Sequence, residues 1–342
     1  MKHKTHQFFM ILFVVPMLLL TACATNGGSD GASNGSSGHK QKIVFADAGW
    51  DSLRFHNWVA RTILQAGYGY ETSVTQGSTP VTILGLRKGQ IDVYMELWVQ
   101  NVKDVYHKAV ESGDIKKMSV NYDDNHQGFF VPTYVIEGDP ERGIKPMAPD
   151  LESVKDLLKY PDVFNKDNSG KPRIYGSPLG WAVGEIMKQK VKAYGLDSKY
   201  KYFPPGSGTA LKTSLISAYS KGEPWVGYMW GPTWMLGKYD MTLLKEPPYD
   251  PEIWEKNKAT AFPKSPVVVA VNSNFADNAP EVVKFLKQYQ TSADLTNEAL
   301  VYMHKNKASA EEAAKWWMKK HPDLWKKWLP EDIAQKVQKS LQ

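Results

Sequence analysis

The sequence has very little cysteine and none of the common catalytic motifs. Cys23 is the only cysteine among 342 residues, so no internal disulfide can form. The serine nucleophile elbow, the phosphate-binding loop, the dinucleotide-binding glycine pattern and the HExxH zinc motif are all missing. The eight histidines are scattered without metal-ligand spacing. We therefore expect no catalytic residue, metal or cofactor, and a secreted enzyme such as a hydrolase is the weaker hypothesis.

The sequence also lacks a stripe of charge of one sign. Its 42 basic and 36 acidic residues are interspersed and give a modest net charge of +6. This pattern excludes the basic footprint of a nucleic-acid-binding protein. An apolar fraction of 42% over this length is enough for two packed lobes.

Residues 1–22 have the pattern of a secretory signal. Lys2 and Lys4 precede an apolar run over residues 8–20, which is too short to span a bilayer comfortably. The run ends at Leu20-Thr21-Ala22-Cys23, which looks like a bacterial lipobox. We expect cleavage before Cys23 and lipid attachment to it. The alternative is an ordinary cleaved signal followed by an incidental cysteine.

Residues 23–41 are rich in glycine and serine and predict a flexible tether. Together with the lipobox, the tether predicts an extracytoplasmic domain that is anchored to the cell membrane at Cys23.

From residue 42 onward, strand and helix patterns alternate, which predicts an α/β protein. The first expected strands cover residues 42–46, 70–75 and 91–97, with helices over 51–66, 80–88 and 100–112. Later strands are expected at 173–176, 225–229 and 266–271. Clusters of proline and glycine at 138–149 and of proline at 247–251 predict two crossings between lobes. Lobe I would then comprise residues 42–138 and 246–342, and lobe II residues 139–245.

Three of the 12 tryptophans occupy similar positions at the ends of predicted strands or turns. Trp98 follows the strand at 91–97, Trp181 follows a Pro-Leu-Gly turn, and Trp230 ends the strand that begins at Trp225. Ligands of open α/β sheets bind at the carboxyl ends of strands, and hinge closure would bring the three indoles together. The alternative for each tryptophan is ordinary core packing.

The chemistry of this group suits a betaine. An indole face attracts a quaternary ammonium cation by about 0.5–2 kcal/mol. A helix predicted to begin after Trp181 exposes the backbone N–H groups of Ala182 and Val183, which suit a carboxylate. A ligand with one cationic and one anionic end matches both features.

These residues resemble a known family. Four motifs in the region from about residue 42 to the end are similar to those of the glycine betaine/proline substrate-binding proteins of ABC importers. The motifs are Gly67-Tyr68, residues 89–93 leading to Trp98, Gly180-Trp181, and residues 228–234. The resemblance implies a type II periplasmic-binding-protein fold, with two α/β lobes joined by two hinge crossings. It also implies an aromatic cage at Trp98, Trp181 and Trp230, and an ABC permease and ATPase as partners.

Some residues depart from the pattern of a plain betaine receptor. Trp50 is a candidate fourth wall of the cage, and Trp234 a candidate aromatic behind it. Asp51 either caps a helix or adds negative charge to the site, which would favour choline. Glu96 poses the same question, although strand alternation can point it away. Carnitine, proline and trimethylamine N-oxide remain alternative ligands, and a chemosensory or adhesive surface module is a lower alternative.

Overall fold

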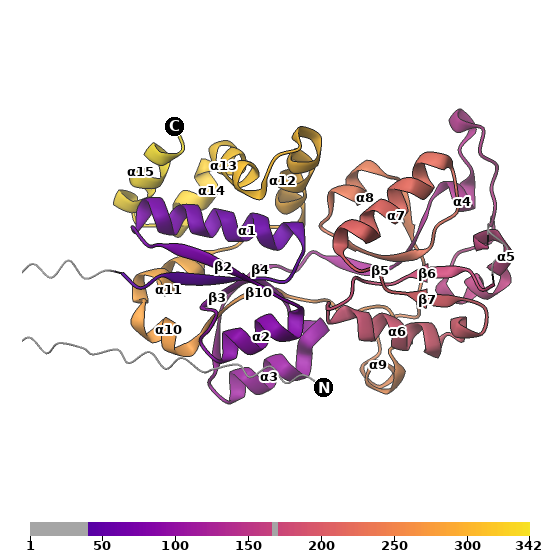
Figure 1. The fold of residues 1–342 in the computed structure, drawn as a ribbon, viewed down its shortest axis with the longest axis horizontal. Helices are drawn as coiled ribbons and strands as arrows, with labels where there is room; N and C mark the ends of the chain where they lie inside the picture. Colours follow the sequence, from indigo (N-terminus) through magenta and orange to yellow (C-terminus); the bar gives the residue numbers. More distant parts are fainter. Residues whose placement is uncertain (1–39, 166–169) are drawn as a thin grey trace, which may run out of the picture. The chain divides into compact units, whose positions relative to one another are not determined.

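A computed structural model describes residues 40–165 and 170–342. The predicted signal over residues 1–22, the predicted lipidation site Cys23 and residues 23–39 of the predicted tether lie outside the described residues. Within the described ranges the chain forms two five-stranded sheets, each covered by helices (Figure 1).

The first sheet has the strand order β2-β1-β3-β10-β4. β1 pairs in parallel with β2 and β3, whereas β10 runs antiparallel to both β3 and β4. Every residue of β3 and β10 is buried, as expected for central strands covered on both faces. The strands are β1 Ile43–Asp47, β2 Thr72–Gln76, β3 Val93–Trp98, β4 Ile115–Tyr122 and β10 Val267–Asn272.

Helices from both ends of the described chain cover the first sheet. α1 and α12–α14 lie on one side of it and α2 and α3 on the other (Figure 1). α1 packs on α13, where the rings of Phe55 and Trp317 meet edge to face with centroids 5.5 Å apart. The helices are α1 Asp51–Thr62, α2 Thr79–Arg87, α3 Lys103–Glu111, α10 Ser273–Asn278, α11 Pro280–Gln288, α12 Ala293–Asn306, α13 Ala310–Lys320, α14 Pro322–Trp325 and α15 Glu331–Ser340.

The second sheet repeats this plan with the order β7-β6-β8-β5-β9. β6 pairs in parallel with β7 and β8, and β5 runs antiparallel to β8 and β9. α7 and α8 lie on one side of this sheet and α6 and α9 on the other (Figure 1). Its strands are β5 His126–Pro132, β6 Arg173–Tyr175, β7 Lys201–Phe203, β8 Gly227–Gly231 and β9 Met241–Leu243. Its helices are α4 Tyr134–Glu137, α5 Pro161–Phe164, α6 Val183–Ala193, α7 Gly208–Lys221, α8 Trp234–Lys238 and α9 Pro251–Asn257.

Short helical turns complete both lobes. A π-helical turn, η1 Ile63–Gly67, extends α1 toward the glycine at which the sequence predicted its end. The 3-10 turns are η2 Val99–Val102, η3 Pro140–Arg142, η4 Val154–Lys159, η5 Leu196–Ser198 and η6 Lys326–Trp328.

The chain passes between the two sheets at places other than the predicted ones. It leaves the first sheet after β4 and enters the second at β5, so the passage precedes the expected boundary after residue 138. It returns between α9, which packs on α6, and β10, beyond the predicted crossing at 247–251. A buried apolar run such as β5 carries no signal of which sheet it joins. The proline-rich segments instead form surface loops and the start of α9. The two passages lie side by side, since Asn125 Nδ2 donates to the carbonyl of Ser265 at 2.6 Å.

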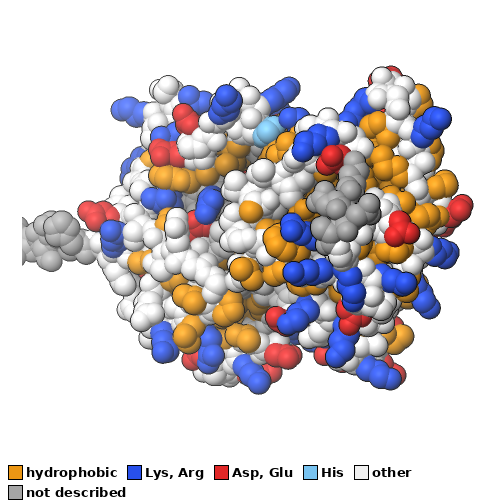
Figure 2. Space-filling model, turned by 45° about the vertical axis from the view of Figure 1, so that its right-hand side comes forward, with side chains coloured by type: hydrophobic (Ala, Val, Ile, Leu, Met, Phe, Trp, Pro, Cys, Tyr) orange, Lys and Arg blue, Asp and Glu red, His pale blue; other side chains and the backbone are white. Residues whose placement is uncertain are grey.

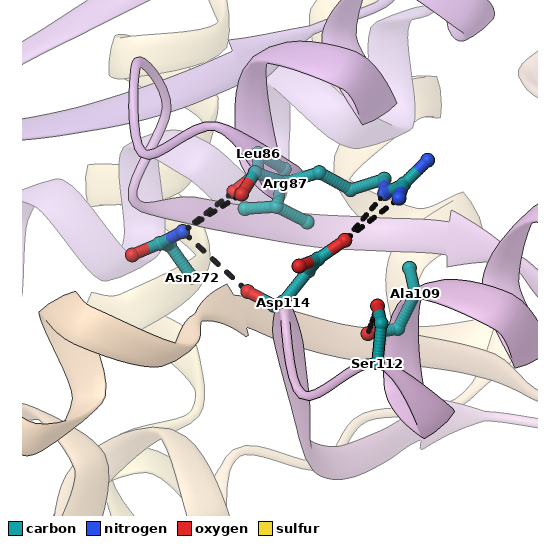
Figure 3. Close-up of polar contacts among 6 residues, drawn as sticks. All are labelled: Leu86, Arg87, Ala109, Ser112, Asp114 and Asn272. Atoms are coloured by element: carbon teal, nitrogen blue, oxygen red, sulfur yellow. Dashed lines mark hydrogen bonds and ion pairs between the residues drawn. The ribbon is translucent and has the colours of Figure 1, made fainter.

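Asn272, at the end of β10, joins the end of α2 to the turn before β4 (Figure 3). Its side-chain amide donates to the carbonyl of Leu86 at 2.9 Å, and its oxygen accepts from the N–H of Phe275 at 3.2 Å, which caps α10. Beside it, the guanidinium of Arg87 pairs with Asp114 at 2.7 Å. This cluster fixes the edge of the sheet away from the pocket described below.

Charged side chains are spread over the surface. On the face in Figure 2, lysines and arginines alternate with acidic and uncharged residues, in line with the interspersed charges of the sequence. Among the helices that the structure describes, none is both long enough and apolar enough to cross a membrane.

Candidate ligand-binding site

One pocket of the described chain is lined by residues of both lobes and by no charged side chain. Threonine and asparagine, at Thr79 and Asn101, are the polar side chains of the lining apart from the aromatic ones. Its aromatic residues are Trp50, Tyr94, Trp98, Trp181, Tyr228 and Trp230. The pocket therefore offers mainly aromatic faces and no charged group to a ligand.

Two of the tryptophans belong to the first lobe. Trp98 is the last residue of β3, and Trp50 stands in extended conformation immediately before α1. Gly49 precedes it with φ +100°, a backbone conformation that side-chain-bearing residues rarely adopt. This turn at the carboxyl end of β1 directs Trp50 toward the pocket, and both indoles are more than nine-tenths buried.

The other two tryptophans belong to the second lobe. Trp230 lies in β8, and Trp181 follows Gly180, whose φ of +86° makes the turn before α6. The rings of Trp181 and Trp230 meet edge to face with centroids 5.0 Å apart. Trp181 also meets Trp50 edge to face at 5.4 Å, a contact that joins the two lobes. The three tryptophans expected from the sequence, and the candidate Trp50, thus line one pocket.

Two tyrosines of the pocket were missed by the sequence reasoning. Tyr94 and Tyr228 precede Trp98 and Trp230 by four and two residues on the same strands. Side chains at even spacing lie on the same face of a strand, so this alternation is the signal that would have identified them. Tyr228 stacks on Trp230 with centroids 5.7 Å apart and holds its hydroxyl against Gln127 at 2.9 Å.

Glu96 lies on the same face of β3 but does not line the pocket. It is fully buried, and its Oε1 accepts hydrogen bonds from Ser52, Trp98 and Tyr122 at 2.9, 3.0 and 2.7 Å. Burial raises the pKa of Glu96 to about 7, although these donors act to lower it. The carboxyl thus sits behind the indole of Trp98 and not beside a ligand.

Ala182 and Val183 line the pocket at the start of α6, as the sequence predicted for a helix start. The N–H groups in the first turn of a helix have no partner within that helix, and the helix dipole is positive there. This end of the pocket therefore suits an anionic group.

Asp51 and Trp234, both predicted as ligand-binding residues, do not line this pocket. Asp51 is the first residue of α1 and pairs with Lys212 of α7 at 2.5 Å, so its charge is matched across the two lobes. It is not the helix cap either, because Trp50 occupies that position. Trp234 begins α8 and stacks on His304 of α12, with ring centroids 3.5 Å apart. One residue along a helix rotates the side chain by about 100°, which separates Asp51 from Trp50.

A second, polar cavity of about 360 Å³ adjoins the aromatic pocket and shares Trp50, Trp181 and Trp230 with it. Asp51 and Lys212 lie on this side of the indoles. Among the described residues, no group of His, Cys, Asp and Glu is arranged to hold a metal ion.

Two α/β lobes that enclose an uncharged aromatic pocket define a solute-binding protein with the periplasmic-binding-protein fold. The chain belongs to the family of substrate-binding domains of ABC-type glycine betaine transport systems, whose family model matches residues 41–320. Members of this family bind solutes outside the cytoplasm and are not enzymes, so the hypothesis of a secreted enzyme is set aside.

Individual relatives are distant. The trimethylamine N-oxide-binding protein of Pelagibacter ubique is 23% identical over 319 residues, which cover 92% of this chain and 98% of the relative. The structure of a glycine betaine/L-proline-binding protein from Borrelia burgdorferi has a TM-score of 0.71 at 20% identity, and covers 87% of this chain and 100% of its own. A choline-binding protein in complex with choline also gives 0.71, at 22% identity, and covers 88% and 98%. These two structures share the fold with this chain.

Proposed function

We propose that this protein captures glycine betaine, or a closely related quaternary ammonium solute, in a cage formed by Trp50, Trp98, Trp181 and Trp230. Two lobes close around the ligand, and the loaded protein delivers it to an ABC permease driven by its ATPase. No covalent chemistry is involved.

The observation that carries the proposal is the convergence of four indoles on one pocket without a charged side chain. A quaternary ammonium group cannot donate hydrogen bonds, so it is recognised by π faces. Four faces at about 0.5–2 kcal/mol each supply enough attraction for a ligand of this size. The neutral lining also places no lysine or arginine beside the ammonium group, where it would repel the cation.

The anionic end of glycine betaine suits the start of α6 at Ala182 and Val183. Choline is favoured less, because Asp51 is paired with Lys212 and brings no carboxylate to the pocket. Trimethylamine N-oxide is the second candidate, since a relative that matches 92% of this chain is named for binding it. Carnitine and proline are further outcomes of the same test.

The experiment is a calorimetric titration of the full chain with glycine betaine, trimethylamine N-oxide, choline, carnitine and proline. Trp181→Ala should abolish binding of the true ligand. Trp58→Phe is the matched control, because this indole lies outside the pocket under the guanidinium of Arg61 at 3.9 Å. Saturable binding that survives Trp181→Ala would contradict the cage. The absence of binding to every quaternary amine and to the N-oxide would contradict the ligand class.

The lipobox supports anchoring of the protein through a lipid on Cys23. Cys23→Ser should move the protein from the membrane fraction to the soluble fraction of expressing cells and remove the mass of the lipid. A variant that stays in the membrane fraction would contradict this anchor.

A further inference from the structure

Glu96 receives hydrogen bonds from an indole of the pocket while remaining out of reach of a ligand. It has no exposed surface, and three donors converge on its Oε1. One of them is Nε1 of Trp98, at 3.0 Å. The ring of Trp98 therefore stands between the carboxyl and the pocket, with its N–H end directed at the carboxyl.

The indole N–H of Trp50 is directed at the same carboxyl. It is one of the donors that lower the pKa of Glu96. Nε1 of Trp50 and Oε2 of Glu96 are nevertheless both buried without a hydrogen-bond partner among the described residues. They are a buried donor and a buried acceptor left over in one cluster, and pairing them gives two indoles whose N–H ends share one carboxyl.

No cation of the described protein balances this carboxyl. The titratable groups that interact with it are Tyr122 from β4, Tyr289 from the end of α11 and Tyr94 from β3 itself. His56 from α1 packs against the ring of Tyr122. Burial lowers the pKa of His56 to about 3, and its ring is held neutral between Tyr289 and Thr296. A lysine or arginine is not among the groups that act on Glu96.

We propose that Glu96 is a buried positioning residue and counter-charge that acts through Trp50 and Trp98. By holding their N–H ends it orients both rings, and its negative charge makes their faces more attractive to a cationic head group. The positive charge that balances Glu96 is then that of the bound ligand. This inference rests on the proposed function, and it assigns the preference for positive charge to a residue that the ligand does not touch.

A consequence follows for protons. The pKa of Glu96 is raised to about 7 by burial, so at neutral pH the empty site holds a mixture of carboxyl and carboxylate. A cation over the two indoles favours the carboxylate, and binding therefore releases part of a proton.

The test compares the full chain with Glu96→Gln, which keeps an acceptor oxygen and loses the charge. Each is titrated calorimetrically near pH 7 with two pairs of ligands of equal shape. Glycine betaine is paired with 3,3-dimethylbutanoate and choline with 3,3-dimethylbutanol, in which carbon replaces the charged nitrogen. Asp92→Asn is the matched control, because Asp92 is a buried carboxylate immediately before the same strand, and its Oδ2 accepts a hydrogen bond from the N–H of Val44.

We expect Glu96→Gln to weaken binding of the charged ligand by roughly 10- to 30-fold and to leave its carbon analogue unaffected. Asp92→Asn should change neither. Proton release, measured by titration in buffers of different ionisation enthalpy, should occur with the wild type and Asp92→Asn and vanish in Glu96→Gln. The wild-type measurement requires no substitution, so it stands even if the variant folds poorly.

Two results would overturn the role of Glu96 without affecting the proposed function. One is ligand binding by the wild type without proton release, and the other is an equal loss of affinity in Glu96→Gln for a charged ligand and its carbon analogue. If the wild type binds neither a quaternary amine nor the N-oxide, the proposed function fails and this inference fails with it.

Discussion

The free energy of unfolding of Glu96→Gln, measured relative to the wild type, should increase as the pH rises from 4.5 to 8. The carboxyl of Glu96 is fully buried, and burial raises its pKa from 4.5 to about 7. Glutamine keeps the size and an acceptor oxygen but does not titrate. A difference between the two proteins that changes with pH therefore reports on this one group.

The sign follows from linkage. The pKa in the folded state lies above that of the unfolded chain, so the stability contributed by protonated Glu96 is fully present below pH 4.5. It is lost as the pH rises through about 7, because the unfolded chain ionises first. The interval between 4.5 and 7 corresponds to roughly 3 kcal/mol in favour of Glu96→Gln. The amide group left without an acceptor adds an offset that does not vary with pH.

The assay is urea unfolding of both proteins without ligand, at about six pH values between 4 and 8. Tryptophan fluorescence and circular dichroism monitor the unfolding transition. The other titrating groups are common to both proteins and cancel in the difference. Parallel pH profiles, with a difference constant within about 0.5 kcal/mol, would refute the reasoning. A difference that falls with pH would show instead that the carboxylate is stabilised in the fold.

Three other substitutions test the framework of the site. Lys190→Met should lower the free energy of unfolding by about 3–5 kcal/mol, because Glu246 would remain buried without the ion pair that it forms with Lys190 at 2.6 Å. A loss below about 1 kcal/mol, measured by urea unfolding, would contradict this. Asn272→Leu should cost about 2–4 kcal/mol through two lost hydrogen bonds, as a thermal melt would report, and an unchanged melting temperature would disprove it. Lys212→Met should weaken ligand binding by roughly two- to fivefold, because the interlobe ion pair with Asp51 is lost. The affinity should also depend less on salt than in the wild type. Equal affinity at low and high salt in both proteins would argue against this.

Much of the fold and most of the pocket could be predicted from local patterns. Trp98, Trp181 and Trp230 were identified because each follows a strand or a glycine turn, and the ends of strands gather at one edge of a sheet. Local patterns say little about which strands pair with one another when they are far apart in the sequence. The buried run of β5 looks alike in either sheet, so its partner, β8, was not predicted.

The errors at the site have a common physical cause, which is that the direction of a side chain depends on its partner. Asp51 turns to Lys212, which lies 161 residues further along the chain, and Trp234 turns to His304. Neither partner is visible from sequence spacing. For Glu96 the sequence left the direction open. Alternation places it on the same face of β3 as Trp98, and it is kept from the pocket by its hydrogen bonds to Trp98 and Tyr122.

The edge-to-face contact of Trp50 with Trp181 has a kinetic consequence. In the proposed cage these rings come from different lobes, so separation of the lobes breaks their contact, which is 5.4 Å between centroids. If the solute leaves by this route, lobe separation limits its dissociation, and solutes of unequal affinity share a common slow step. A transporter that draws the lobes apart does not need a higher affinity for the solute than the indoles have. Once the lobes are separated, the tryptophans of each lobe alone no longer enclose the solute.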